Sequence, residues 1–210
     1  LGTRLILNGN ITTSGSTTSS IVVDPAGGST GARDILLSNV AGAFTRTITV
    51  GAGGADLNIN APITTGTATT ASITKAGVGT LSLGAASTYN GTTAISTGTL
   101  RINVADALPP TTALTLGNVA NLDTATFDLN GFNQTLAGLS SVGTMPITVT
   151  NSGALATLTV NNATGNTTYA GTIAGALNLA KTSAGQLTLT GATANTYTGT
   201  TAVSTGSPAI

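Results

Sequence analysis

Apolar residues recur two positions apart along nearly the whole chain, and this spacing limits what the chain can fold into. The pairs are Leu5/Leu7, Ile48/Val50, Leu57/Ile59, Leu81/Leu83, Leu100/Ile102, Leu114/Leu116, Phe127/Leu129, Ile147/Val149, Leu158/Val160, Leu177/Leu179 and Leu187/Leu189. Because alternate side chains of a strand point to opposite faces, this period predicts short β-strands. Gly, Asn, Ser or Asp follows nearly every pair, and a new strand begins about every ten to twelve residues, as in a β-sandwich, barrel or solenoid.

The composition excludes several classes of protein. Charged residues make up 6% of the chain, with six Lys and Arg against six acids, and the chain lacks His and Cys. Six scattered cations provide no basic surface for nucleic acid. Without His and Cys, histidine-dependent catalysis and Cys/His zinc sites are impossible. We therefore expect no nucleic-acid partner and no cofactor.

Helices and membrane spans are also not expected. The one helix-like stretch, residues 103–108, ends at Pro109-Pro110 and predicts about one helical turn. The longest aliphatic runs, Ile21–Val23 and Ile35–Leu37, are far shorter than the ~20 residues of a membrane helix.

An internal repeat favours a solenoid over the other β architectures. Residues 73–98 recur as residues 179–206, with Lys75 and Lys181 separated by 106 positions and Tyr89 and Tyr197 by 108. Coils that stack on each other need little core of their own, which suits a chain with 3% aromatic residues. We predict one solenoid over residues 1–210, with two units of about 107 residues, approximately 1–102 and 103–210. At ~20–25 residues per coil it would have about nine coils.

The repeated segment also resembles a known family. From Lys75 to Leu100 the chain reads KAGVGTLSLGAASTYNGTTAISTGTL, and residues 181–206 repeat this pattern. The pattern resembles the autotransporter-associated β-strand repeat, also called the passenger-associated transport repeat. Residues 127–136 (FDLNGFNQTL) are similar to a spacer of that family, so that the resemblance covers about residues 44–206. It implies an all-β, right-handed parallel β-helix in a large exported surface protein of a Gram-negative-type bacterium.

From these observations we expect an extracellular, non-catalytic structural segment at the bacterial cell surface. It would form a stalk, or a fibre by end-to-end association of copies, or part of a larger polypeptide. The alternative is an adhesin that contacts glycans or surfaces through the loops at 24–34 or 140–146. A polysaccharide-acting β-helix enzyme is the third class.

The carboxylates do not suggest a catalytic pair. A glycosidase needs two carboxylates that face one bond. Asp123 and Asp128 are five positions apart, so on a strand they would point to opposite faces. With its two apolar neighbours inward, Asp128 is expected to face water, and Asp24 and Asp34 are assigned to a loop.

Residues 51–59 (GAGGADLNI) are similar to a calcium-binding nonapeptide. Calcium needs six to eight oxygen ligands, which tandem copies supply, and here there is one imperfect copy. We therefore expect a turn that enters a strand and no metal site.

The repeated lysines and tyrosines are given structural roles. Lys75 and Lys181 are expected to be solvated charges that discourage edge pairing, not nucleophiles. Tyr89 and Tyr197 are expected to pack against a turn. Outward Thr rows are interrupted by Ala, Ser and Asn, which does not favour an ice-binding surface. We assign no catalytic, cofactor-binding or metal-binding residue.

Overall fold

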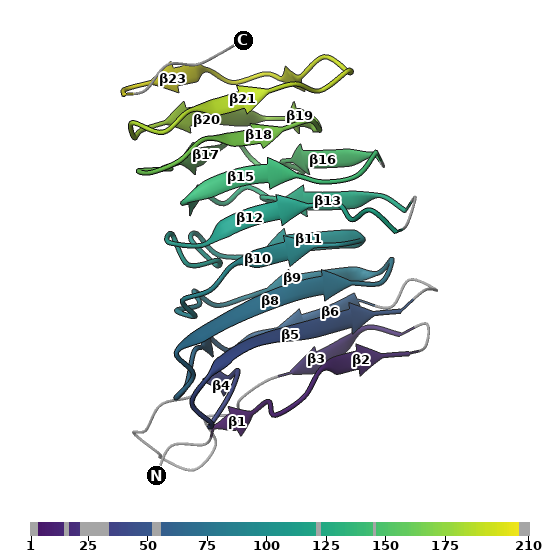
Figure 1. Cartoon of the computed structure of the whole chain (residues 1–210). Coiled ribbons are helices and arrows are strands. Elements are labelled where there is room, and N and C mark those ends of the chain that lie inside the picture. Colours follow the sequence, from purple (N-terminus) through teal and green to yellow (C-terminus); the bar gives the residue numbers. More distant parts are fainter. Residues whose placement is uncertain are drawn as a thin grey trace.

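The chain folds as a stack of parallel β-strands, shown in Figure 1. The computed structural model describes residues 4–14, 17–21, 34–51, 56–120, 123–144 and 146–205. Within these ranges every strand pairing is parallel and there is no helix. This confirms the predicted all-β solenoid, while its handedness stays a prediction.

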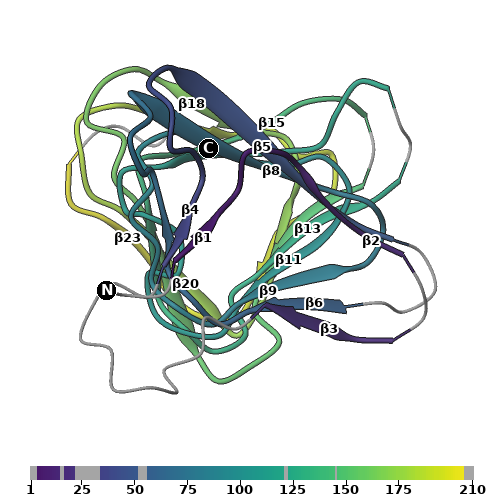
Figure 2. The ribbon, with the colours of Figure 1, turned by 90° about the horizontal axis from the view of Figure 1, so that it is seen from below.

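Seen along its axis, the solenoid has three faces, as Figure 2 shows. The first face contains β1 (Leu5–Ile6), β4 (Ile35–Leu36), β7 (Ile63–Thr64), β14 (Gln134–Leu136), β17 (Ala156–Val160), β20 (Leu177–Lys181) and β23 (Thr201–Val203). The second contains β2 (Ile11–Thr13), β5 (Ala43–Val50), β8 (Thr70–Ala76), β10 (Thr93–Ile95), β12 (Ala113–Leu116), β15 (Gly138–Ser141), β18 (Thr167–Tyr169) and β21 (Leu187–Leu189). The third contains β3 (Ser19–Ile21), β6 (Asp56–Ile59), β9 (Thr80–Leu83), β11 (Gly98–Ile102), β13 (Ala125–Asp128), β16 (Ile147–Thr150), β19 (Thr172–Gly175) and β22 (Thr196–Tyr197).

The solenoid makes about seven turns, slightly fewer than the nine predicted. The eight strands of the third face, from β3 to β22, mark these turns. Successive turns differ in length, because Leu57 pairs with Leu81 in the following coil, whereas Ser19 pairs with Leu57 across a much longer stretch of chain. Chain inserted at a corner lengthens a turn without adding a coil, and this reduces the number of coils.

The core consists of side chains stacked in register from coil to coil. On the third face, Leu57, Leu81, Leu100, Phe127 and Val149 occupy successive positions, and all are buried. Each contributes about 1.5–3 kcal/mol by removal from water. Since the stacked positions are the inward members of the period-two pattern, the sequence predicts this core correctly.

The helix-like stretch at 103–108 forms a bend and turn instead, so the predicted helical turn is wrong. Asp106 has a φ of 48°, outside the helical region, and its N–H donates to Asn133 O at 2.9 Å. Leu108 is buried, and its N–H donates to Gln134 Oε1 at 3.1 Å. These contacts with the next coil outweigh the weak local preference for a helix.

Asparagine side chains join neighbouring coils near the strand ends. Oδ1 of Asn90 accepts from the Ala71 N–H at 3.0 Å. The same kind of bond links Asn133 to the Thr157 N–H, at 2.8 Å. In this way, backbone N–H groups that have no partner in the strand ladders donate a hydrogen bond.

Candidate functional site

Lys75 lies inside the solenoid, so the prediction of a solvated charge is wrong. It follows Ile73 by two positions in β8 and shares its inward face, with 0% of the residue exposed. Its Nζ donates to the carbonyl oxygens of Ala76, Gly77 and Thr97 at 2.9, 2.6 and 3.0 Å. These three acceptors match the three N–H bonds of an ammonium group and replace its water.

The surroundings of Lys75 affect its ionisation and its access to ligands. In the strand register it lies between Ile48 and Ile95, both fully buried. Burial lowers the pKa of Lys75 to about 8. A lowered pKa is typical of nucleophilic lysines, but this amine is bound by backbone carbonyls inside the stack. Through these hydrogen bonds the Lys75 amine links the corner between β8 and β9 to the next coil.

Lys181 has an equivalent position in the second repeat. It lies between Val160 and Val203 in register, is 5% exposed, and its Nζ donates to the carbonyl of Ser183. Burial also lowers its pKa. Lys75 and Lys181 therefore both interrupt an aliphatic ladder with a cation bound to the carbonyl two residues further on.

Each repeated tyrosine forms a hydrogen bond with the threonine four positions later. The hydroxyls of Tyr89 and Thr93 lie 2.5 Å apart, as do those of Tyr197 and Thr201. Tyr89 is buried and Tyr197 is half-buried. Packing of both side chains against the apolar core agrees with the structural role expected for them.

A glycine follows each tyrosine by two positions and allows the backbone to come close to the preceding coil. The Gly91 N–H donates to Ala71 O at 2.8 Å, and the Gly199 N–H donates to Leu177 O at 3.1 Å. A Cβ at either position would overlap these carbonyls. These glycines were not predicted as packing positions, although their recurrence two positions after each repeated tyrosine was a signal in the sequence.

Asp128 is buried, so the prediction that it faces water is wrong. It does point away from the core, but its side chain is only 4% exposed because the neighbouring coils cover it. Arg101 Nε lies 3.1 Å from Oδ2, Ser152 donates through both its N–H and its hydroxyl, and the Asn130 N–H donates to Oδ1. Asp123 is exposed, and the two carboxylates do not form a catalytic pair.

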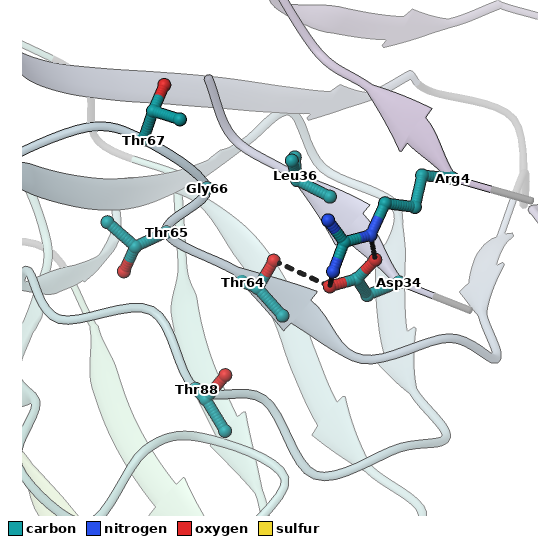
Figure 3. A pocket seen from close by; sticks show the side chains of 8 residues that line it. All are labelled: Arg4, Asp34, Leu36, Thr64, Thr65, Gly66, Thr67 and Thr88. Atoms are coloured by element: carbon teal, nitrogen blue, oxygen red, sulfur yellow. Dashed lines mark hydrogen bonds and ion pairs between the residues drawn. The ribbon is translucent and has the colours of Figure 1, made fainter. Parts of the chain in front are cut away.

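Asp34 takes part in a site that sequence reasoning did not find. It forms an ion pair with Arg4, with Nε 2.8 Å from Oδ1, and accepts a hydrogen bond from the Thr64 hydroxyl at 3.1 Å, as Figure 3 shows. Beside it lies a hollow of about 380 Å³, whose lining is completed by Leu36, Thr65, Gly66, Thr67 and Thr88. Sequence reasoning placed Asp34 in a loop, but no sequence signal pointed to Arg4 as its partner.

The second loop named from the sequence, 140–146, also borders a hollow. Thr144 and Pro146 belong to this loop, and the hollow of about 290 Å³ extends over the two following coils to Thr172 and Thr193. Among the described residues, no charged side chain lines it. Residues 24–33 of the other loop lie outside the described residues.

In the described part of the chain, no three Asp side chains come together as metal ligands. In the glycine-rich segment at 51–59, residues 52–55 lie outside the described residues, and Asp56 begins β6.

Comparison with known proteins identifies the repeated segments. A family model described as passenger-associated-transport-repeat matches residues 73–102 and, a second time, residues 179–207. The chain contains two passenger-associated transport repeats. No curated protein and no solved structure shows a significant match to it. The family implies a passenger segment of an autotransporter, which is a secreted β-helix.

Each passenger-associated transport repeat spans one coil, from one strand to the strand that stacks directly on it. In the first, β8 pairs with β10, so that Ile73 is in register with Thr93 of the same matched segment. In the second, β20 pairs with β23, and Leu179 is in register with Thr201. One matched segment therefore contains a strand and the strand that stacks directly on it.

The two repeats do not face the same way. Figure 2 places β8 on the second face and β20 on the first. The sequence period is therefore not a whole number of turns. In the described residues, no helical segment has the length and apolarity needed to cross a bilayer.

Proposed function

We propose that this chain is a non-catalytic structural segment of an exported bacterial surface protein, where it forms an extracellular stalk or part of a fibre. The observation that carries the proposal is that Lys75 and Asp128 are both bound in contacts between coils. Lys75 binds the carbonyl of Thr97 in the next coil, and Asp128 binds Arg101 on one side and Ser152 on the other. Groups used in this way join coils and are not exposed to substrate.

The coil that each repeat forms supports the same function. Contacts between residues one short coil apart cost little loop entropy, so such a coil forms locally and gives its neighbours an edge to stack on. In a solenoid, stability is approximately a sum of such neighbour contacts. A rod can therefore be lengthened without a larger core, which suits a stalk.

Addition of further coils is compatible with the charge of the chain. Within the described residues, β1, β2 and β3 each pair on one side only, as do β22 and β23 at the other end. A strand from the same polypeptide or from a second copy can add to such an edge. The formal net charge of zero removes the self-repulsion that would oppose this stacking.

Small-angle scattering and electron microscopy of the purified chain at increasing concentration test the proposal. A rod whose length grows with concentration supports the fibre, and a rod of constant length supports the stalk. A compact particle without an elongated axis contradicts both. Turnover of a polysaccharide or peptide substrate by the pure chain contradicts the non-catalytic role.

An adhesin is the second candidate, because described residues of the two loops named from the sequence line hollows. Asp34 borders the hollow of Figure 3, and Thr144 and Pro146 border the other. A glycan array tests this function with the wild-type chain and the variant Thr172→Val. Saturable binding that the variant weakens supports an adhesin site at 140–146, and binding to no glycan contradicts it.

A further inference from the structure

The ion pair between Arg4 and Asp34 lies on the outside of the first face. Ile35 is part of the core, so its neighbour Asp34 points outward, yet the Asp34 side chain is only 11% exposed, against 48% for Arg4. Asp34 Oδ2 accepts from the Thr64 hydroxyl and from Arg4 Nη2. Its buried Oδ1 contacts Arg4 Nε as an ion pair but accepts no well-aligned hydrogen bond among the described residues. Asp34 therefore holds the Arg4 guanidinium beside the hollow, and about half of the Arg4 side chain remains exposed.

A turn at residues 65–67 builds one wall of the adjoining hollow. Gly66 has a φ of +73°, and a Cβ there would overlap the carbonyl oxygen of Ser38. The Thr67 N–H donates to the same carbonyl at 3.1 Å, which fixes the turn over Leu36. Thr88 comes from the next coil, where its N–H donates to Ile63 O at 2.8 Å. The hollow is thus formed by backbone bonds between coils and does not depend on a single loop.

The lining of the hollow defines the chemistry of a ligand. Its charges, Arg4 and Asp34, cancel, so an ionic ligand would have to break their ion pair. The hydroxyls of Thr67 and Thr88 have no hydrogen-bond partner among the described residues and are available as donors and acceptors. Leu36 adds an apolar contact. The volume of about 380 Å³ is near the lower end of ligand pockets, which suits one small unit.

We propose that this hollow binds one neutral sugar unit of a glycan. Hydroxyls of the sugar accept hydrogen bonds from the exposed Arg4 guanidinium, which Asp34 holds in place, while the free threonine hydroxyls bind the remaining polar groups. The C–H side of the ring contacts Leu36. This site rests on the adhesin function proposed above and specifies its ligand. The stalk function does not depend on it, because a stalk of the same architecture needs no ligand, and the site lies apart from the hollow at 140–146.

Saturation-transfer NMR with the full 210-residue chain tests this site. The neutral probes are glucose, galactose, mannose and N-acetylglucosamine, and the charged probes are glucuronate and glucosamine. We expect saturable binding of at least one neutral probe and weaker binding of both charged ones. Failure of all four neutral probes to bind at millimolar concentration overturns the proposal, as does tighter binding of a charged probe.

Two variants and a matched control locate the binding. Asp34→Asn removes the charge that holds the Arg4 guanidinium in place. Thr88→Val removes a hydroxyl that has no partner among the described residues, so this second change leaves the solenoid intact. Thr99→Val makes the same substitution on β11 of the third face. We expect at least a fivefold loss of affinity in the first two variants and none in the third. Affinity unchanged by both pocket variants overturns the assignment of the site.

Discussion

Lys75 and Lys181 occupy the same place in the two sequence repeats, but they lie on different faces of the solenoid. Lys75 is in β8 on the second face and Lys181 is in β20 on the first. Each is in register with two aliphatic residues and donates to the carbonyl two positions later. The lysine therefore belongs to the coil itself and does not mark a particular side of the rod.

The first prediction concerns the stability that Lys75 provides. Lys75→Met keeps the length of the side chain but removes the donors to Ala76, Gly77 and Thr97. We expect a loss of about 1–3 kcal/mol in the free energy of unfolding, the usual cost of buried polar groups that lose their partner. Urea unfolding followed by circular dichroism measures it. Because repeat arrays can unfold in parts, hydrogen exchange of β8 and β10 should show the loss locally.

Lys181→Met is the matched control. The coil that follows Lys181 leaves Val203 39% exposed, and among the described residues the Lys181 Nζ donates one hydrogen bond, against three for the Lys75 Nζ. The second substitution should therefore cost less than the first. A Lys75→Met chain as stable as the wild type would show that the carbonyl contacts contribute nothing.

The second prediction is a pH dependence of stability caused by Lys75. Burial lowers its pKa from 10.5 to about 8 in the folded chain. Between these values the unfolded chain binds more protons than the folded chain, so the free energy of unfolding rises with pH, by at most about 1.4 kcal/mol per pH unit. Well below pH 8 both states are protonated and the dependence is absent. Above pH 10 the raised pKa of buried Tyr89 acts in the opposite direction.

The difference between wild type and Lys75→Met isolates this dependence, since the tyrosines contribute equally to both. Urea unfolding at pH 7, 8, 9 and 10 should show wild type gaining stability relative to the variant at the two higher values. A difference that is constant from pH 7 to 10 would mean that the pKa of Lys75 is not lowered.

The inward position of Lys75 could have been predicted from the sequence, whereas the burial of Asp128 could not. Lys75 follows inward Ile73 by two positions, and Lys181 follows Leu179 in the same way. The period-two pattern placed both side chains inside, but a general preference of lysine for water suggested the opposite. For Asp128 the pattern gives the correct outward direction. Its burial depends on which residues of other coils stack beside it.

The same limit applies to the site in Figure 3. Strands, turns and the solenoid follow from local patterns, which are visible in one sequence. Arg4 and Asp34 come from successive coils, 30 positions apart. Their contact depends on the corner lengths and register of a strand pair, β1 with β4, for which the sequence contains no repeat.

The third prediction tests the close approach of Gly91 to the preceding coil. Gly91→Ala would place a Cβ against Ser72 Oγ and the carbonyl of Ala71, so the coil must shift and its hydrogen bonds weaken. We expect a loss of at least about 2 kcal/mol in the free energy of unfolding. Gly9→Ala is the control, because a Cβ there meets no described atom within 4 Å, and it should change stability by less than about 0.5 kcal/mol. Equal effects of the two substitutions would refute the packing role of Gly91.

The fourth prediction is that Asp128 stabilises the chain at neutral pH and loses this effect in acid. Burial raises its pKa, but hydrogen bonds from Ser152, Asn130 and Arg101 outweigh burial and lower it below 3.8. Its contribution is therefore complete above pH 3.8 and declines as the pH falls through the folded value. Asp128→Asn should cost about 1–3 kcal/mol at pH 6 and less at pH 2, measured by urea unfolding. Asp123→Asn, at an exposed position, should have little effect at either pH, and a comparable loss there would assign the effect to overall charge and not to the Asp128 contacts.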